Sequence, residues 1–219
     1  MIRMAAEPMP TVQVTLIGTP RWRALPQPDQ PLSRKDAALL ALLALEQDAA
    51  RDRVAVWLWP EVSLANARLN LRQRIYKLRQ ACGHTLIDAG ATLRLLPGVA
   101  VDLCTDPLPD RGSLLGDFDY GDLGALDDWL QAARAALLRR QLDQRIGRAA
   151  QLEAEGALAA AIALCESIVA DAPLYEHGWR RLMRLHYLRG DRAAAIGAFE
   201  RFEQQVGAEL GTRPAAETL

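Results

Sequence analysis

The segment from residue 66 to residue 80 concentrates side chains that form hydrogen bonds or carry positive charge. It reads NARLNLRQRIYKLRQ, with four arginines and one lysine, and no acidic residue occurs between Glu61 and Asp88. On an α-helix, residues three or four positions apart share a face. One face of such a helix would present amide and ammonium groups, which can hydrogen-bond the edges of nucleic-acid bases. Its residues are Asn66, Asn70, Gln73 and Lys77.

The other faces of the expected helix differ in character. The opposite face is apolar, as expected of a stripe buried against a core, and comprises Leu64, Ala67, Leu71, Ile75, Leu78 and Cys82. Leu69 and Tyr76 border the polar face on one side and Arg74 borders it on the other. The remaining arginines, Arg68, Arg72 and Arg79, lie nearer the apolar stripe. Cations beside a base-contacting face are typical of DNA-binding helices, where they contact phosphates and fix the register.

A solvated basic face is the alternative interpretation, and a bare run of charge favours it. Three observations favour nucleic-acid binding instead: the helix contains no acidic residue, its central face is rich in amides, and the elements around it have a suitable order. Arg68 keeps a second interpretation, as the partner in a structural ion pair.

The charge of the whole chain is nearly balanced. Its 219 residues have a formal net charge of −1, with 13 basic and 11 acidic residues over 1–110 and 13 basic and 16 acidic residues over 111–219. The basic segment therefore acts locally and not through a global field. No apolar run reaches the roughly 20 residues of a membrane span. Residues 1–10, expected to be a loose tail, lack the apolar centre of a signal peptide. We therefore expect a cytoplasmic protein with no membrane partner.

The elements that must position the basic helix form an α+β region. Residue patterns predict strands over 12–18, 21–25 and 99–104, a proline-rich loop over 26–31, helices over 34–47, 52–59 and 63–82, and a hairpin over 85–97. Ser33 and Ser63 are predicted N-caps, and Gly83 is predicted to end the basic helix. A strand pair, three helices and a hairpin form the layout of a winged helix-turn-helix domain.

The second half of the chain is predicted to be helical and repetitive. Residues 156–166, GALAAAIALCE, align with residues 190–200, GDRAAAIGAFE, at an offset of 34 residues. This offset is the period of tetratricopeptide repeats, in which helix pairs stack to cover one another's apolar faces. Turn-forming residues over 105–116 predict a connection. We therefore expect a winged-helix DNA-binding domain over 11–108 and an all-α tetratricopeptide-like domain over 114–219.

Together these motifs resemble a known family. Residues 67–83, ARLNLRQRIYKLRQACG, resemble the recognition helix of OmpR-type winged helices, and WLWPE at 57–61 resembles the helix end before it. With LIDAGATLRL as the wing and the helical repeats, residues 11–219 resemble the bacterial transcriptional activator domain proteins, the SARP-type activators. The C-terminal stretch over 190–218, with ELG-x-x-P, is similar to that domain's ending.

The resemblance implies a cytoplasmic transcription factor, an activator, that contacts the major groove at direct repeats near promoters. It further implies a head-to-tail homodimer on double-stranded DNA and recruitment of RNA polymerase, with contacts to partners made by the helical domain. Carried over residue by residue, base contacts fall on Gln73 and Lys77. Phosphate contacts fall on Asn70, Arg74, Tyr76 and Arg79. No cofactor is implied.

Other candidate sites are weaker. The histidines His84, His177 and His186 and the cysteines Cys82, Cys104 and Cys165 lack the spacing of zinc ligands, and we expect each cysteine to be a small buried residue. DFDYGD at 117–122 lacks the spacing of a calcium loop. It is either a solvated interdomain loop or an edge that packs against the winged helix.

Two rival functions remain open. One is a protein–protein interaction module, in which the helical repeats bind a partner and the winged helix docks without DNA. A docking helix of that kind would expose apolar residues at positions 66, 70, 73 and 77. The other is an enzyme, which no catalytic constellation supports, so no catalytic or metal-binding residue is predicted.

Overall fold

The structure is a computed structural model that describes residues 12–212 and residue 218. The predicted tail at 1–10, the first residue of the predicted winged helix and the last two residues of the ELG-x-x-P motif lie outside the described residues. The chain divides into two compact units, Met1–Leu138 and Arg139–Leu219. None of the described helices combines the length and hydropathy of a membrane-spanning segment.

A four-stranded sheet opens the first unit. Its strands, in spatial order, are β3 (Gln30–Pro31), β2 (Arg21–Ala24), β1 (Val12–Thr15) and β7 (Val99–Val101). β1 pairs antiparallel with β2 and parallel with β7. Val12 and Val14 are buried while Gln13 and Thr15 are not, which is the two-residue period of a strand with one face on a core. β3 falls in a stretch that was predicted to be a loop.

The last predicted strand ends early. Residues Asp102–Cys104 form a 3-10 turn instead of continuing β7. The side-chain oxygens of Asp102 accept the backbone N–H groups of Leu16 and Ile17, each at 2.9 Å. These bonds satisfy the donors that a longer β7 would otherwise have paired, so the strand is not extended. Burial raises the pKa of Asp102, and the two backbone donors act in the opposite direction.

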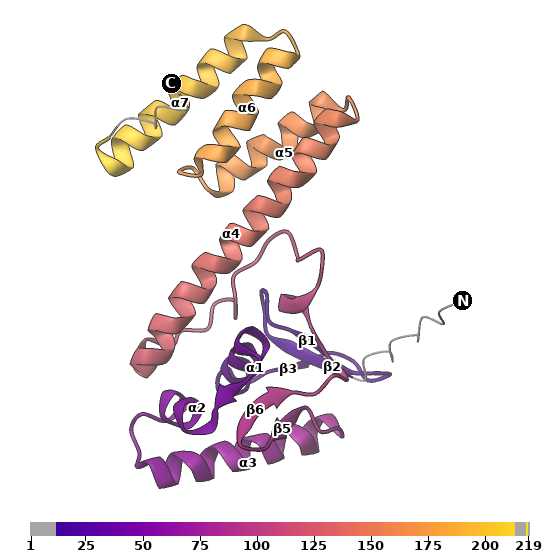
Figure 1. The fold of residues 1–219 in the computed structure, drawn as a ribbon, viewed down its shortest axis with the longest axis vertical. Helices are drawn as coiled ribbons and strands as arrows, with labels where there is room; N and C mark the ends of the chain where they lie inside the picture. The colour runs from indigo at the N-terminus through magenta and orange to yellow at the C-terminus, as the bar shows by residue number, and fades with distance from the viewer. Residues whose placement is uncertain (1–11, 213–217, 219) are drawn as a thin grey trace. The chain divides into compact units, whose positions relative to one another are not determined.

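Three helices and a hairpin follow the first strands (Figure 1). The helices are α1 (Arg34–Glu46), α2 (Arg51–Leu58) and α3 (Leu64–Cys82), and the hairpin consists of β5 (Ile87–Ala89) and β6 (Thr92–Leu95). A two-residue strand, β4 (Ala49–Ala50), precedes α2 and pairs with β6, which ties the hairpin to the helices. The predicted order of strand pair, three helices and hairpin is confirmed.

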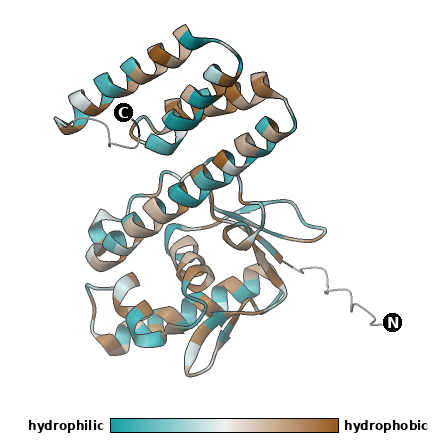
Figure 2. Ribbon diagram, turned by 45° about the horizontal axis from the view of Figure 1, so that its top comes forward, coloured by the Kyte–Doolittle hydropathy of each residue, from teal (hydrophilic) through white to brown (hydrophobic). Residues whose placement is uncertain are grey.

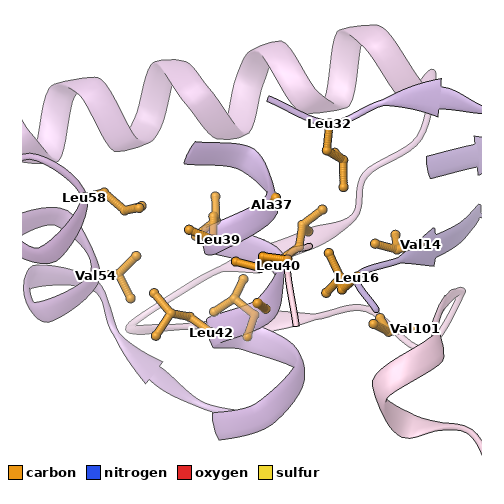
Figure 3. Packing of buried hydrophobic residues seen from close by; sticks show 14 of the residues in the cluster. Val14, Leu16, Leu32, Ala37, Leu39, Leu40, Leu42, Val54, Leu58 and Val101 are labelled. Carbon is orange, nitrogen blue, oxygen red and sulfur yellow. The ribbon is translucent and has the colours of Figure 1, made fainter. Parts of the chain in front are cut away.

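The core of this unit is built around α1. Its residues from Ala37 to Leu43 are all buried, and a helix that is apolar on every side lies inside a core. Figure 3 shows leucines of α1 among side chains from the sheet and from α2. The labelled residues are Val14, Leu16, Leu32, Ala37, Leu39, Leu40, Leu42, Val54, Leu58 and Val101. Burial of each leucine contributes about 1.5–3 kcal/mol, so α1 is the element on which α2 and the sheet depend.

The acidic stretch over 117–122 packs against α1. The buried hydroxyl of Tyr120 donates to the carbonyl oxygen of Arg34 at 2.7 Å, and Arg34 pairs with Asp122 at 2.6 Å. Of the two interpretations of this stretch, an edge that packs against the winged helix is therefore the one observed. The guanidinium of Arg34 lowers the pKa of Asp122 by its hydrogen bond.

The helix α4 (Gly124–Ala154) contributes to the cores of both units. Arg134 donates hydrogen bonds to the backbone carbonyls of Leu114, Gly116 and Phe118, so the chain up to this point belongs to the first compact unit. The units therefore divide later than residues 105–116, where composition predicts the connection. The domain limits 11–108 and 114–219 remain a prediction.

The second unit is all helical. It contains the end of α4, then α5 (Leu158–Asp171), α6 (Glu176–Leu188) and α7 (Arg192–Leu210). Gly156 and Gly190 have φ angles of +77° and +83° in the turns before α5 and α7. These two positions are 34 residues apart and both use the left-handed region that glycine tolerates. The repeat in the sequence is thus a repeat of helix pairs, and Figure 2 shows hydrophilic and hydrophobic residues alternating around these helices.

The two helix pairs differ at one equivalent position. In the second pair, Trp179 is buried against Phe202, with ring centroids 5.6 Å apart, and its Nε1–H donates to the carbonyl of Pro173. In the first pair this position holds Arg145, which is only 5% exposed. Its guanidinium contacts the Asp171 carboxylate and donates to Ser167 Oγ, each at 2.8 Å. A buried guanidinium thus takes the place of the indole ring, and residues of α5 accept its hydrogen bonds.

Replacing Arg145 with alanine is expected to lower the free energy of unfolding by about 1.5–3 kcal/mol, the range for hydrogen bonds that involve charged groups. The loss stays below that of a fully buried pair because the Asp171 side chain is 35% exposed and water can solvate it. Thermal or urea unfolding would measure the change. Arg148→Ala, at an exposed position one turn along α4, is the matched control and should have little effect. Equal stability of the two variants would contradict the assigned role.

Candidate nucleic-acid interface

The helix α3 begins and ends where the sequence predicts. Ser63 Oγ accepts the backbone N–H of Asn66 at 3.4 Å, so Ser63 is the N-cap. Gly83 has a φ angle of +69°, the left-handed conformation that commonly ends a helix. The 19 residues between them, Leu64–Cys82, contain no acidic side chain. The helix therefore has defined ends, and all of its charged side chains are basic.

One side of α3 is buried, and this side fixes how the helix is rotated about its axis. Ala67, Leu71, Leu78 and Cys82 are buried in the core of the first unit, and Ile75 is partly buried against it. Leu64, predicted to belong to this stripe, is 41% exposed. It is the first residue of the helix, one turn before the first buried position, so the prediction for Leu64 is wrong. The other five residues leave only one orientation for the polar face.

The predicted base-contacting face is accessible. Asn66, Gln73 and Lys77 are exposed, and Asn70 is half-buried. Tyr76 is 60% exposed, and Leu69, beside it, is also exposed. Amides, an ammonium group, a phenol and one aliphatic side chain thus lie on the outside of the first unit. All of them have counterparts on duplex DNA: base edges, phosphate oxygens and thymine methyl groups.

The positive side chains of α3 fall into two groups. Arg68 forms a bidentate pair with Asp52 of α2, at 2.7 and 2.5 Å. Arg74, whose side chain is 29% exposed, contacts Asp36 of α1 and the hydroxyl of Ser33, the N-cap of that helix, both at 3.4 Å. The remaining three, Arg72, Lys77 and Arg79, are exposed and make no ion pair within the described part of the chain. The alternative interpretation of Arg68 as a structural partner is confirmed.

Arg74 has a structural contact in addition to its predicted role. Asp36 lies in the first turn of α1, where Ser33 Oγ donates to its Oδ2 at 2.5 Å, and Asp36 Oδ1 is buried without a hydrogen-bond partner among the described residues. Arg74 thus offsets a carboxylate at the edge of the core. A phosphate at this position would share the guanidinium with Asp36, which distinguishes Arg74 from Arg79.

The hairpin of β5 and β6 is the wing. Its register pairs Ile87 with Leu95 and Ala89 with Leu93, and Arg94 pairs with Asp88 at 2.9 Å on its surface. Arg51, the first residue of α2, donates from Nη2 to the carbonyl oxygen of Ala89. The sequence analysis did not single out Arg51, because its position beside the wing depends on how the hairpin packs against α3. In the sequence, the only indication of a further basic residue near α3 was the pair Arg51 and Arg53 in the short helix that precedes it.

The cysteines and histidines do not form a second site. No group of three or more potential metal ligands is found among the described residues. Cys82 and Cys165 are buried, as predicted, and burial raises the pKa of each thiol to about 11. Cys104 is exposed, with its Sγ 3.7 Å from the carbonyl oxygen of Ala44, so the prediction that it is buried is wrong. It lies in the 3-10 turn that ends β7 and not in a strand facing the core.

The chain is similar in sequence to known transcriptional regulatory proteins. Residues 111–219 match the family model for the bacterial transcriptional activator domain. The transcriptional regulatory protein EmbR of Mycobacterium tuberculosis is 25% identical to the chain, over 93% of the chain and 58% of EmbR. MoaR1 of the same species, also a transcriptional regulatory protein, is 27% identical over 83% of the chain and 68% of MoaR1. The chain thus spans less than two thirds of the length of EmbR.

A solved structure shows the same fold. Mycobacterium tuberculosis EmbR, in complex with a low-affinity phosphopeptide, superimposes with a TM-score of 0.73 at 19% identity, covering 95% of this chain and 63% of that one. The predicted fold class, an α+β winged region followed by an all-helical region, is confirmed. The resemblance to the SARP-type activators is also confirmed. Residues 111–219 are therefore a bacterial transcriptional activator domain, and the chain is homologous to EmbR and MoaR1 over most of its length.

Proposed function

We propose that the chain is a transcriptional regulator that binds duplex DNA by placing α3 in the major groove. The observation that supports this most is the exposed face of Asn66, Gln73 and Lys77 on a helix whose opposite side is buried. Polar groups that can bond base edges are thus held outward on a rigid element. The major groove admits an α-helix and presents a distinct pattern of donors and acceptors for each base pair.

The side chains divide into base-contacting and phosphate-contacting groups. The Gln73 amide can pair with adenine, and the Lys77 ammonium can donate to the N7 and O6 acceptors of guanine. We assign Asn66 to the same face. Phosphate contacts fall on Arg72 and Arg79, whose charges have no partner among the described residues, and on the Tyr76 hydroxyl. Asn70, half-buried, and Arg74, shared with Asp36, complete the set.

The family supports the regulatory part of the proposal. EmbR and MoaR1 are named as transcriptional regulatory proteins, and the matched domain is a transcriptional activator domain and not an enzyme. We extend this to a cytoplasmic activator that occupies direct repeats near promoters as a homodimer and contacts RNA polymerase. The second unit exposes large apolar side chains at Tyr187, Leu188 and Ile196. This surface on α6 and α7 is where we place the contacts with partners.

A protein-docking role for the winged helix has less support. Such a role requires apolar residues at positions 66, 70, 73 and 77, and these positions hold two asparagines, a glutamine and a lysine. Selection of bound sites from random duplex DNA at two salt concentrations separates the two functions. Recovery of a repeated site with salt-dependent affinity is expected. Failure to bind any duplex would favour the interaction module.

The double substitution Gln73→Ala with Lys77→Ala is expected to relax sequence preference while the protein still binds DNA. Each lost bidentate contact removes about 1–3 kcal/mol of discrimination between base pairs. Competition between the selected duplex and single base-pair variants of it would measure the loss. The change should be confined to the base pairs under these two residues, and an unaltered preference at every position would exclude the assigned roles.

Substitution of Arg79 by glutamine is expected to weaken binding to all duplexes equally. Loss of one phosphate contact should reduce the slope of log affinity against log salt by about 0.9. The matched control is Arg68→Gln with Asp52→Asn, which removes an exposed ion pair without changing the net charge. Such pairs contribute little to stability, and the control should retain the parental salt slope. A selective loss on one sequence would show that Arg79 contacts a base.

A further inference from the structure

A small cleft lies between α3, the start of α2 and the end of β5. Its lining residues are Arg51, Arg68, Leu71, Arg72, Ile75 and Ala89. The cleft has a volume of about 60 Å³. That volume admits a few water molecules or one group of phosphate size, and it is far below the ~300–1,000 Å³ of a pocket for an organic ligand. Three of the six lining side chains are arginines over an apolar floor.

The charge of the cleft is only partly offset. Asp52 neutralises Arg68, and Asp88, the acidic residue of the neighbouring strand β5, pairs with Arg94. Arg51 and Arg72 form no ion pair with any residue that the structure describes. Two guanidinium groups therefore face one small space without a carboxylate between them. Like charges brought together in this way repel each other, and an anion bound between them would remove that cost.

Arg51 also has an unused donor. Its Nη2 donates to the carbonyl of Ala89, while its Nε is buried and has no hydrogen-bond partner within residues 12–212. A buried donor without an acceptor costs about 1–3 kcal/mol. The residue itself is half-buried, so its guanidinium reaches the cleft without being fully solvated. Because the Nε atom is itself buried, an anion in the cleft would be held by the other N–H groups of the guanidinium.

We propose that this cleft takes one phosphate group of the DNA backbone, held by Arg51 and Arg72 together. The proposal rests on the function proposed above and adds a binding site and a residue, Arg51, that lies outside α3. Arg72 directly precedes Gln73, so the two side chains project about 100° apart around the helix axis. If Gln73 contacts base edges, Arg72 is therefore directed towards the sugar-phosphate backbone beside the groove. The fork of N–H groups on each arginine suits bidentate contact with a phosphate.

The cleft also links the wing to the proposed contact with the DNA phosphate. Because Arg51 holds the carbonyl of Ala89, the position of β5 and the position of the guanidinium are set by the same hydrogen bond. A phosphate in the cleft therefore contacts an arginine that is already oriented by the wing. Less side-chain freedom is lost on binding than for an unrestrained surface arginine.

The first test compares Arg51→Gln with Arg53→Gln. Arg53 is on the same helix, is exposed, pairs with Glu46 and lies 5.1 Å from the ring of Trp57, outside the cleft. Arg51→Gln should weaken binding about tenfold, and by the same factor for the selected duplex and a random one, as expected for loss of a charged hydrogen bond to the backbone. Arg53→Gln should bind like the parent protein. Equal affinity of Arg51→Gln and the parent would overturn the proposal.

The second test asks whether the two arginines share one phosphate. Removing both, in Arg51→Gln with Arg72→Gln, should reduce the slope of log affinity against log salt by about 0.9 in total, and a reduction of about 1.8 would mean two separate phosphates and contradict the shared site. If Arg51→Gln does not fold, as judged by thermal unfolding, Arg51→Lys takes its place. Lysine keeps the charge but replaces the fork of N–H groups by a single ammonium. A several-fold loss is then expected, and parental affinity would overturn the proposal.

These outcomes are separate from the failure of the proposed function. If the parent protein binds no duplex at all, the regulator that contacts DNA through α3 is excluded along with this site. If the parent binds a selected duplex with strong salt dependence and the Arg51 variants match it, only the cleft is excluded. The Gln73 and Lys77 substitutions then still test the base contacts.

Discussion

The packing of α3 against α1 and α2 is the constraint on which the rest of the first unit depends. Four side chains of α3 are buried in a core whose centre is the apolar middle of α1, residues 37–43. Burial of those side chains fixes the rotation of α3, because turning the helix by a quarter would expose Leu71 and Leu78 at a cost of about 1.5–3 kcal/mol each. The opposite face is therefore directed away from the core, with Asn66, Gln73 and Lys77 exposed. The polar face is a consequence of the core.

The sequence was informative wherever a local rule decides the structure. The N-cap at Ser63, the end at Gly83 and the burial of Leu71 and Leu78 follow from capping chemistry and from a 3.6-residue period. The 34-residue offset predicted two helix pairs, and the left-handed glycines at Gly156 and Gly190 mark both of them. These features are set by residues close together in the chain, so a single sequence suffices to find them.

The sequence was less informative wherever a partner comes from a distant segment. Arg34 and Tyr120 are 86 residues apart, and nothing local indicates that the stretch over 117–122 packs on α1. The short strand β4 forms only because β6 lies beside it, and the exposure of Cys104 follows from a turn that Asp102 stabilises through the chain near Leu16. Within the candidate site, the same reason hid Arg51. Its contact with Ala89 spans 38 residues and exists only once the hairpin is in place.

The positive side chains of α3 show how local sequence and distant packing together bear on function. Sequence alone shows five cations on α3, but it cannot distinguish those that stabilise the fold from those that are available to a ligand. Packing makes the distinction, because Asp52 and Asp36 belong to the two helices that α3 contacts. Arg68 and Arg74 pair with these carboxylates, whereas Arg72, Lys77 and Arg79 are exposed and make no ion pair within the described residues. Since the chain as a whole has a net charge of −1, the proposed attraction to DNA depends on local groups such as these and not on a global field. Under the proposed function, such a local surface would lose most of its attraction for DNA when it is turned away from the duplex. The charges that supply affinity would then also select the orientation of the domain, and with it the register of the polar face on the bases.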